Sequence, residues 1–262
     1  MIDTHCHLTF SEYAGRIDQV LADAASAGVT GAITISTTTQ DCLSALAIAE
    51  KFENVWCSAG VHPLYADRGP HVWDNLRTVA SHPKCVAWGE LGLDNHYDKP
   101  IADVQRQTLH EQLAFIESCR SGAEAIDLPI VVHCREAYDD LLPILRESST
   151  PADRHVFHCF TGNADEARRV LDFGALISFT GVVTFGNAPE VREAAKLVPM
   201  DRMMVETDSP FLTPAPHRKI RPNEPKYAMD TARFLADLRG AAWDAFHAQI
   251  NENSQRFYGV PC

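Results

Sequence analysis

The sequence predicts a single α/β barrel, in which eight parallel strands close into a cylinder and helices surround them. Eight apolar runs rich in β-branched residues alternate with segments of helical periodicity, as expected for repeated strand–helix units. The length of 262 residues is close to the ~250 residues typical of this fold. Histidines and carboxylates follow several of the apolar runs, and such barrels carry their active sites at the carboxyl ends of the strands.

The expected strands are short apolar runs. They lie near residues 1–6, 29–36, 54–61, 85–91, 129–134, 154–160, 174–180 and 202–208. No Ser/Gly-rich linker, change of composition or low-complexity segment interrupts the series. We therefore expect one domain, a TIM (β/α)8 barrel that spans residues 1–262.

Segments of helical periodicity fill the intervals between these runs. They lie near 14–27, 39–52, 71–81, 103–124, 137–148, 163–173, 187–198, 226–239 and 241–257. In the long helix at 103–124, Leu109, Leu113 and Ile116 recur at helical spacing and predict a face packed on the barrel. The Pro-rich segment 209–225, after the last strand, predicts a loop.

Composition limits the classes of function. Charged residues make up 22% of the chain and hydrophobic residues 45%, which are ordinary values for a soluble globular protein. The formal net charge of −12 argues against electrostatic binding along a nucleic-acid duplex, which uses a basic surface. No stretch of ~18 apolar residues and no leader peptide occur, so we expect a cytoplasmic protein that does not enter a membrane.

The chain has eight cysteines and no Cys-x-x-Cys pair. Several lie inside the apolar runs, and we expect Cys57, Cys85, Cys134 and Cys159 to be small buried hydrophobic residues in a reduced compartment. Cys6, Cys134 and Cys159 each neighbour a histidine of interest. Strand alternation predicts that these thiols point away from the histidines.

Two residue pairs share the spacing that places side chains on one face of a strand. His5 and His7 would bind one metal ion from a single strand, although such a pair alone also occurs on solvated surfaces. Glu206 and Asp208 have the same spacing near the last strand. Because further histidines and carboxylates stand at other strand ends, we interpret these pairs as parts of one metal site.

Strand alternation also separates two histidines of the sixth strand. His155 and His158 differ by three positions and must point to opposite faces. We take His158 as a metal ligand and His155 as a structural or surface residue. On the fifth strand, His133 shares its face with Arg135.

Six segments carry a resemblance to a known family. They are His5-Cys6-His7-Leu8, Gly60-Val61-His62-Pro63, Gly89-Glu90-Leu91-Gly92-Leu93-Asp94, Val132-His133-Cys134-Arg135, His158-Cys159-Phe160-Thr161-Gly162 and Glu206-Thr207-Asp208-Ser209-Pro210. In this order, over nearly the full length, the chain resembles the TatD family of metal-dependent deoxyribonucleases, in the branch that keeps the N-terminal His-x-His. The resemblance implies an eight-stranded barrel and a phosphodiesterase that shortens DNA from its 3′ end, with divalent metal ions as cofactors.

The resemblance also implies two metal ions that share Glu90. The residues expected at the first ion are His5, His7, Glu90 and Asp208, and those at the second are Glu90, His133 and His158. A carboxylate suits a bridge because its two oxygens reach metals ~3.5–4 Å apart. Imidazole ligands favour Zn²⁺ or Mn²⁺, whereas the family is often active with Mg²⁺, so all three ions remain candidates.

Catalytic roles are expected for three carboxylates. Glu90 would hold the ions around the attacking water, and Asp208 would accept a proton from that water. Glu206 would act as a proton shuttle, as a ligand of a third ion, or as a hydrogen-bond partner of the ligands. Asp94 is expected to orient a ligand or to cap its loop rather than to bind metal.

Four residues are candidates for substrate binding. The resemblance places His62 near the substrate phosphate, with a core or capping histidine as the alternative. Arg135 offers a forked donor for phosphate, with a surface ion pair as the alternative. Arg218 and Lys219 belong to a basic cluster in the last loop, which is either a phosphate-binding patch or a solvated run of charge. A glycine common in the family after this arginine is absent, and this departure weakens the assignment for the loop.

Other functions compete with a deoxyribonuclease. Related hydrolases include aminoacyl-tRNA deacylases and small-molecule amidohydrolases, many of which bridge their metals with a carboxylated lysine. The segments around Glu90 and His133 have no lysine, which favours phosphodiester chemistry. A non-catalytic metal-dependent binding protein is a third reading, and loss of a ligand would have favoured it. The expected partner is DNA, as single strands or 3′ ends, and no obligate protein partner can be inferred.

Overall fold

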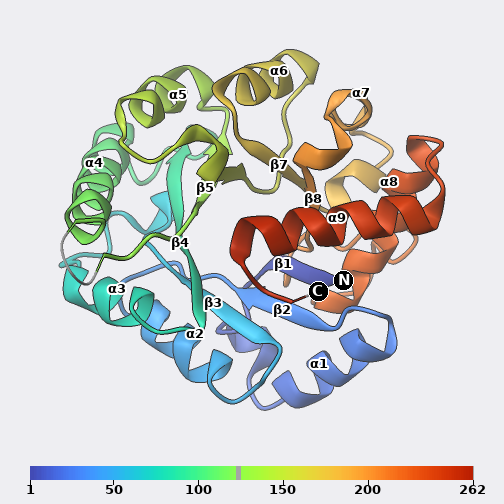
Figure 1. Cartoon of the computed structure of the whole chain (residues 1–262), viewed down its shortest axis with the longest axis horizontal. Helices are drawn as coiled ribbons and strands as arrows, with labels where there is room; N and C mark the ends of the chain where they lie inside the picture. Colours follow the sequence, from blue (N-terminus) through green and yellow to red (C-terminus); the bar gives the residue numbers. More distant parts are fainter. Residues whose placement is uncertain (122–124, 262) are drawn as a thin grey trace.

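The computed structural model describes residues 1–121 and 125–261 and places them in a barrel of eight parallel strands. Each strand pairs with its neighbours in chain order (Figure 1). The strands are β1 (Ile2–Cys6), β2 (Gly31–Thr34), β3 (Val55–Ala59), β4 (Cys85–Asp94), β5 (Ile130–Arg135), β6 (His155–Phe157), β7 (Leu176–Phe179) and β8 (Met203–Val205). The expected fold class is thereby confirmed.

Residues just beyond β8 close the barrel against β1. A parallel bridge joins Cys6 to Ser209, and the backbone N–H of His7 donates to the carbonyl of Ser209 at 2.8 Å. The N–H of Asp208 donates to the carbonyl of His5 at 2.9 Å. The segments that follow the last strand therefore lie directly beside the first histidine pair.

Helices alternate with the strands and form the outer layer (Figure 1). They are α1 (Ile17–Ser26), α2 (Asp41–Ala49), α3 (Trp73–Ala80), α4 (Ala102–Cys119), α5 (Tyr138–Glu147), α6 (Ala164–Phe173), α7 (Pro189–Leu197), α8 (Ala228–Leu238) and α9 (Trp243–Tyr258). Short 3-10 helices are η1 (Ser11–Tyr13), η2 (Pro63–Tyr65), η3 (Ala152–Arg154), η4 (Gly181–Thr184), η5 (Met200–Arg202) and η6 (Pro225–Tyr227). The helix expected at 103–124 ends at Cys119, and residues 122–124 lie outside the described residues.

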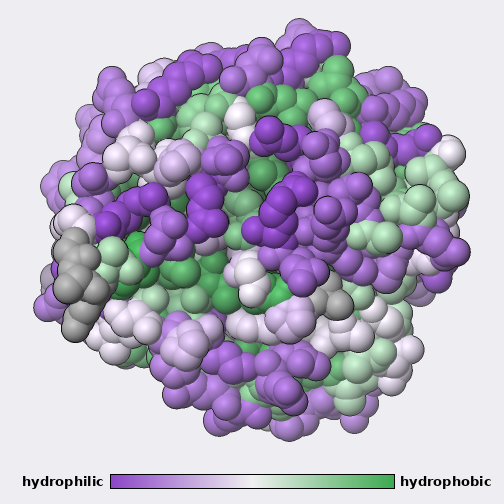
Figure 2. Space-filling view, viewed as in Figure 1, coloured by the Kyte–Doolittle hydropathy of each residue, from purple (hydrophilic) through white to green (hydrophobic). Residues whose placement is uncertain are grey.

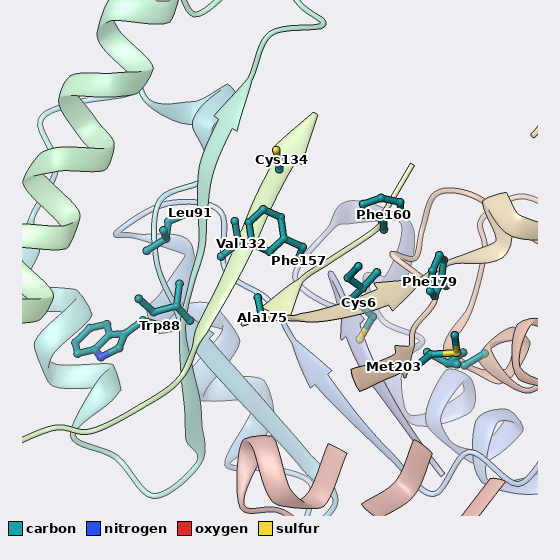
Figure 3. Close-up of a cluster of buried hydrophobic side chains, with 14 of the residues drawn as sticks. Cys6, Trp88, Leu91, Val132, Cys134, Phe157, Phe160, Ala175, Phe179 and Met203 are labelled. Carbon is teal, nitrogen blue, oxygen red and sulfur yellow. The ribbon is translucent and has the colours of Figure 1, made fainter. Parts of the chain in front are cut away.

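Two apolar clusters flank the strands. The outer cluster packs strand residues such as Trp88 and Phe157 against the helices (Figure 3). Within it, Leu109 and Ile116 of α4 are buried and Leu113 packs beside them, as their spacing predicts. The outer layer of the molecule is largely hydrophilic in the view of Figure 2, with apolar residues visible between the helices.

The inner cluster fills the end of the barrel that lies opposite the carboxyl ends of the strands. All eight strands contribute a side chain to it, among them Ile2, Val131 and Val156. Phe257 and Tyr258 of α9 complete the cluster, and α9 lies across the barrel near β1 in Figure 1. Because this end is filled with apolar side chains, polar chemistry is confined to the opposite end, at the carboxyl ends of the strands.

The cysteines follow the expected burial with one exception, although Cys134 as well as Cys159 borders the cavity described below. Of the seven described cysteines, all without disulfides, six are buried. Cys159 is only partly buried, lines the cavity described below, and has a φ of 44°, so strand alternation does not apply to it. The expectation that it is a buried residue pointing away from the site is wrong, because β6 has already ended at Phe157.

No helix in the described part of the chain is long and apolar enough to cross a membrane.

Candidate active site

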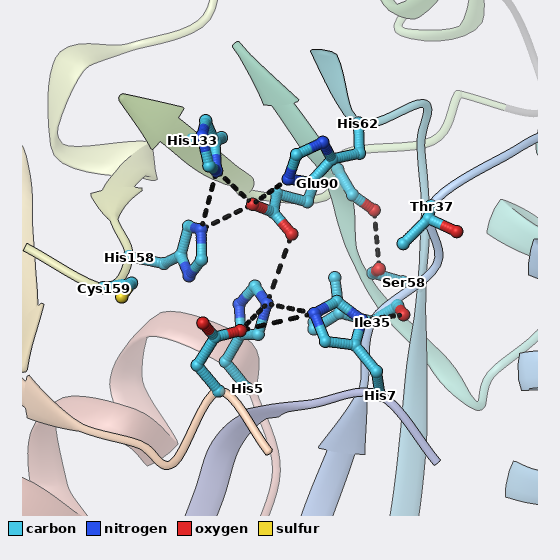
Figure 4. Close-up of polar contacts among 12 residues, drawn as sticks. His5, His7, Ile35, Thr37, Ser58, His62, Glu90, His133, His158 and Cys159 are labelled. Atoms are coloured by element: carbon cyan, nitrogen blue, oxygen red, sulfur yellow. Dashed lines mark hydrogen bonds and ion pairs between the residues drawn. The ribbon is translucent and has the colours of Figure 1, made fainter. Parts of the chain in front are cut away.

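Glu90 stands at the centre of a cluster of buried or partly buried histidines (Figure 4). Its Oε1 lies 2.6 Å from His133 Nδ1, 2.5 Å from His158 Nε2 and 3.3 Å from His62 Nε2. Its other oxygen, Oε2, lies 3.3 Å from His5 Nε2. The two oxygens of one carboxylate thus face two different sets of imidazoles.

A bulge in β4 carries Glu90 into the barrel mouth. Trp88 and Leu91 are three residues apart, yet both belong to the outer cluster, because the pairing of β4 with β5 shifts between them. Gly89 permits this bend with a φ of +113°, and a Cβ there would lie 2.4 Å from the carbonyl oxygen of Val131. Any other residue at position 89 would displace the strand that presents Glu90.

The first strand and the segment after β8 form one side of the cluster. Nε2 of His5 and Nε2 of His7 are 3.3 Å apart, and Asp208 Oδ1 lies 3.7 and 3.3 Å from them. Nδ1 of His7 lies 3.0 Å from the carbonyl oxygen of Ile35, which can only accept, so this nitrogen carries the proton. The lone pair of His7 therefore sits on Nε2, beside His5 and Asp208.

Strand alternation explains only part of this side. β8 ends at Val205, and Asp208 adopts a left-handed backbone with a φ of 53°. The expected strand near 202–208 is therefore too long at its carboxyl end. Glu206 and Asp208 still reach the same cluster, but a turn rather than a pleat directs Asp208 into it.

Asp94 fixes the orientation of His133 on the other side. Asp94 Oδ2 lies 2.9 Å from His133 Nε2, so Nδ1 of the same ring is left to face Glu90. Asp94 Oδ1 accepts the backbone N–H groups of His96 and Tyr97 at 3.0 and 3.3 Å. Asp94 therefore caps its loop, as expected, and orients His133, the residue expected to be a ligand.

Glu206 contacts His158 and the turn that follows β6. Its Oε1 accepts the backbone N–H of Cys159 at 2.6 Å and lies 3.4 Å from His158 Nδ1. The ring of His158 stacks on that of His5, with centroids 3.9 Å apart. Glu206 thus anchors the turn after β6 and contacts one histidine of the cluster directly.

Burial and pairing set the charges of the cluster. Burial raises the pKa of Glu90, but the neighbouring His158, His62 and His5 outweigh it and hold this pKa well below its usual range. Burial acts to lower the pKa of His158, yet Glu90 and Glu206 raise it well above the ordinary value. Burial prevails at His5, where the pKa falls, and at His62, where it falls to about 4. A carboxylate is therefore surrounded by neutral as well as charged imidazoles.

The donor atoms fit divalent metal ions. Three groups of ligand atoms lie within 4.8 Å of one another: His5, His7 and Glu90; His62, Glu90 and His133; His5, His158 and Glu206. Glu90 Oε2, His5 Nδ1 and His158 Nδ1 are buried and have no hydrogen-bond partner among the described residues. Neutral imidazoles around a carboxylate are the ligand chemistry of Zn²⁺ and related ions. The cluster is thus equipped to bind metal.

His62 faces the cluster as a donor. Its Nδ1 accepts the backbone N–H of Leu64 at 2.9 Å, which caps η2, so the proton of the neutral ring lies on Nε2. This nitrogen points toward Glu90 Oε1 at 3.3 Å. The structure shows the capping role of His62, and it directs the protonated Nε2 of the ring to the cluster around Glu90.

A cavity of about 710 Å³ opens above the cluster. Its lining includes Glu90, Asp208 and five of the candidate residues already described: His7, His62, Asp94, His133 and His158. Arg135 also lines it, with its guanidinium 5.1 Å from the ring centroid of Tyr97. Arg218 and Lys219 are exposed and are not among the described lining residues, and Arg218 packs on the ring of Phe185 at 3.3 Å.

Two glutamines of α4 hold backbone segments of the site in place. They were not identified from the sequence. Gln112 pairs through both amide atoms with the backbone of Val61, which precedes His62, at 2.8 and 2.9 Å. Gln105 pairs in the same way with the backbone of Asp94 at 2.8 and 2.9 Å. Both side chains are buried in the apolar stripe of the helix, and a polar residue in such a stripe is the signal that could have found them.

Comparison with known proteins agrees with this geometry. A family model described as TatD related DNase matches residues 2–259. The chain belongs to the TatD family. It is 38% identical over 263 residues to a protein of Escherichia coli K12 named uncharacterized metal-dependent hydrolase YcfH, covering 99% of this chain and 96% of the relative. A Klebsiella pneumoniae relative named 3'-5' ssDNA/RNA exonuclease TatD is 32% identical over 265 residues, covering 99% and 98%.

Solved structures support the same assignment. The TatD homolog YjjV of E. coli has a TM-score of 0.89 at 29% identity and covers 100% of this chain and 98% of that one. A TatD family hydrolase from Entamoeba histolytica shares the fold, with a TM-score of 0.86 at 24% identity and coverage of 98% and 97%. The chain is therefore a metal-dependent hydrolase of the TatD family, and the resemblance seen in its sequence is confirmed.

Proposed function

We propose that this TatD-family hydrolase is a 3′-5′ exonuclease that cleaves the phosphodiester bonds of single-stranded DNA. The observation that carries the proposal is the position of Glu90, whose two oxygens face separate histidine sets at the base of an open cavity. Support also comes from the Klebsiella relative, whose name gives this polarity and single-stranded DNA and RNA as substrates.

The residues that would hold the metal ions are those of the cluster. They are His5, His7, Glu90 and Asp208 for one ion and Glu90, His133 and His158 for the other, with Glu206 beside them as a candidate ligand of a third. Bound Mg²⁺, Mn²⁺ or Zn²⁺ would acidify the attacking water and neutralise charge on the phosphate. Asp94 and the carbonyl of Ile35 would keep the ligand nitrogens of His133 and His7 free of protons.

Asp208 is the proposed proton acceptor. Burial raises the pKa of its carboxyl, but the contact with His7 and the charges of the neighbouring His5 and His158 outweigh this and keep the pKa below the ordinary value. Asp208 is therefore ionised at neutral pH and lines the cavity, where it would take a proton from water. Glu206 contacts His158 and would relay that proton or hold the ring in place.

Arg135 and His62 are the proposed phosphate ligands. Arg135 lines the cavity and carries a permanent positive charge in a forked geometry suited to a phosphate. His62 presents an Nε2–H toward the same space, as required to donate to a phosphate oxygen. Together they would orient the scissile phosphate over Glu90.

The test is the product ladder from 5′-end-labelled single-stranded DNA in Mg²⁺, Mn²⁺ or Zn²⁺. We expect stepwise shortening from the 3′ end and no activity after chelation. The matched control is Glu90→Gln, which keeps the volume of the side chain and would remove contaminating nuclease as an explanation. Uniform internal nicking of a closed circular single strand, as fast as cleavage of the linear strand, would contradict the exonuclease assignment.

Ester or amide hydrolysis of another substrate is the alternative. Among the described residues that line the cavity none is a lysine, so no carboxylated lysine is available there as a metal bridge. Assaying an aminoacyl-tRNA beside the labelled strand separates the two functions. Faster turnover of the aminoacyl ester would replace the nuclease proposal.

A further inference from the structure

We propose that Phe211, backed by Phe10, forms a stacking surface for the nucleobase next to the scissile phosphate. The inference rests on the proposed nuclease function and names a contact with the substrate other than its phosphate. Phe10 and Phe211 would then determine the preference of the protein for an unpaired strand.

The ring of Phe211 is exposed to water, although leaving an apolar ring in water is unfavourable. The exposed large hydrophobic residues of the described chain are Val72, Tyr97, Ile101, Phe211 and Ile220. Only Phe211 and Tyr97 of this set are aromatic, with 48% and 49% of their surface exposed, and both line the cavity above Glu90. An aromatic ring that is accessible at the mouth of a cavity offers a face on which a nucleobase can stack.

Hydrogen bonds hold the backbone of Phe211 next to the metal-binding cluster. Its N–H donates to the carbonyl of Asp208 at 3.0 Å, and its own carbonyl accepts from the amide of Asn223. Asn223 is fully buried and also donates to the carbonyl of Thr207 at 3.2 Å. The ring is therefore presented from a fixed turn, three residues after the proposed proton acceptor.

Phe10 extends the surface toward the ligands. Its ring lies 6.0 Å from that of Phe211 at an angle of 81°, which is the favoured edge-to-face arrangement. On its other side, Phe10 stacks on His7 at 4.9 Å and 21°. A continuous series of rings thus leads from a proposed metal ligand to the exposed Phe211.

The opposite wall of the cavity has a different character. Tyr97 follows β4, which stands across the barrel from β8 and β1, the strands flanking Phe10 and Phe211. The guanidinium of Arg135 lies over Tyr97 and gives this wall a positive charge. One wall therefore suits a phosphate, and the other, which is apolar, suits a base.

Charge alone would not retain a strand here. The chain carries a net charge of −12, and Arg218 and Lys219 lie outside the described cavity lining. Stacking of a base on an aromatic ring does not depend on base identity but requires a base that is unstacked and unpaired. Phe211 would thus supply affinity and select single strands at once.

The first test measures binding with a readout independent of turnover. The probe is a single-stranded oligonucleotide with 2-aminopurine at its 3′ end and phosphorothioate terminal linkages, mixed with the Mg²⁺-loaded protein. We expect stacking to quench the fluorescence of the probe. Phe211→Ala should lose this quenching and weaken binding by roughly 5- to 150-fold, the range measured for single stacked bases. Phe211→Trp should restore both.

The matched control is Ile220→Ala in the same loop. Ile220 is 44% exposed but is not among the described lining residues, so its removal should leave quenching and affinity as in the wild type. Equal quenching and affinity in Phe211→Ala and the wild type would overturn the inference. Phe211→Leu keeps an apolar side chain without a ring and should behave as Phe211→Ala.

The second test compares strands ending in a normal or an abasic 3′ residue. The ratio of their kcat/KM values should exceed one in the wild type and fall toward one in Phe211→Ala. A wild type that cleaves strands with an unchanged ratio in the variant would overturn the stacking surface alone. A wild type that cleaves no strand, with any metal ion, would overturn the proposed function together with this inference.

Discussion

His155 and His158 stand at the two ends of one short strand segment and are both buried, yet they have opposite electrostatic surroundings. His155 lies against Phe173 of α6, with ring centroids 5.3 Å apart, and its pKa falls to about 4 because burial disfavours the charged ring. His158 enters the barrel mouth, where Glu90 and Glu206 overcome the effect of burial and raise its pKa well above the usual range.

The difference shows that burial alone does not create a site. Nδ1 of His155 lies 3.0 Å from the carbonyl oxygen of Pro151, while its Nε2 has no partner among the described residues. His158 has two carboxylates and a stacked histidine. Convergence of carboxylates on imidazoles, and not their depth, distinguishes the mouth of the barrel from its helix-facing side.

The largest effect is expected from removing the shared carboxylate. Glu90→Ala should lose bound metal and reduce kcat/KM by well over 100-fold, because changes to residues that merely support ligands already cost 10- to 100-fold. Elemental analysis and turnover of the purified variant measure both effects. Glu193→Ala, an exposed carboxylate on α7, is the control. Full metal content in Glu90→Ala would refute the bridging role.

The paired substitutions His158→Ala and His155→Ala test the comparison directly. His158→Ala should reduce turnover by orders of magnitude and lower metal content, because it removes a proposed ligand. His155→Ala should leave turnover nearly intact but destabilise the protein by about 2 kcal/mol, since it empties a fully buried position. Turnover, bound metal and Tm are measured on both. Equal losses of turnover would mean that the strand presents both rings to the site.

The pH dependence of stability separates the two histidines in another way. The folded pKa of His155, about 4, is below the ordinary value of 6.5, so protons favour the unfolded chain. The contribution of the neutral ring is complete above pH 6.5 and is lost as the pH falls toward 4. At pH 5 this amounts to at most about 2 kcal/mol. The fall in Tm from pH 7.5 to pH 5 should therefore be smaller in His155→Leu, and an equal fall would show a charged ring in the folded protein.

The smallest effect is expected in the basic part of the last loop. Arg218→Ala with Lys219→Ala should raise KM for single-stranded DNA about threefold and flatten its salt dependence, with less change in kcat. Lys51→Ala with Lys196→Ala, at exposed positions elsewhere, matches the change in net charge. An unchanged KM would assign the loop cations to solvated surface, in keeping with the packing of Arg218 on Phe185.

Strand alternation predicted part of the site from the sequence, because it depends only on the local spacing of residues. It predicted that His155 and His158 face opposite ways, and the contacts of His155 with Phe173 and of His158 with His5 agree. It could not decide between a structural and a surface role for His155. The surface alternative is wrong, since the ring is fully buried behind α6.

A local rule could not predict features that depend on contacts between segments far apart in the sequence. The bulge at Gly89 depends on a positive φ and on the pairing of β4 with β5. Neither can be inferred from the local spacing of residues. The left-handed turn at Asp208 shortens β8 for a similar reason. Gln105 and Gln112 act on backbone groups of other segments, so their role appears only once the barrel is formed.

The closure of the barrel has a consequence for how the protein is made. The carboxylate of Asp3 accepts hydrogen bonds from Thr207, 204 positions later in the chain, and the carbonyl of His5 accepts from the N–H of Asp208. During synthesis, the first two histidines emerge from the ribosome long before Asp208. A nascent chain would therefore lack one proposed ligand until β8 and the turn that follows it have been released. The proposed site for the ion that uses His5, His7 and Asp208 would thus be complete only at the end of synthesis.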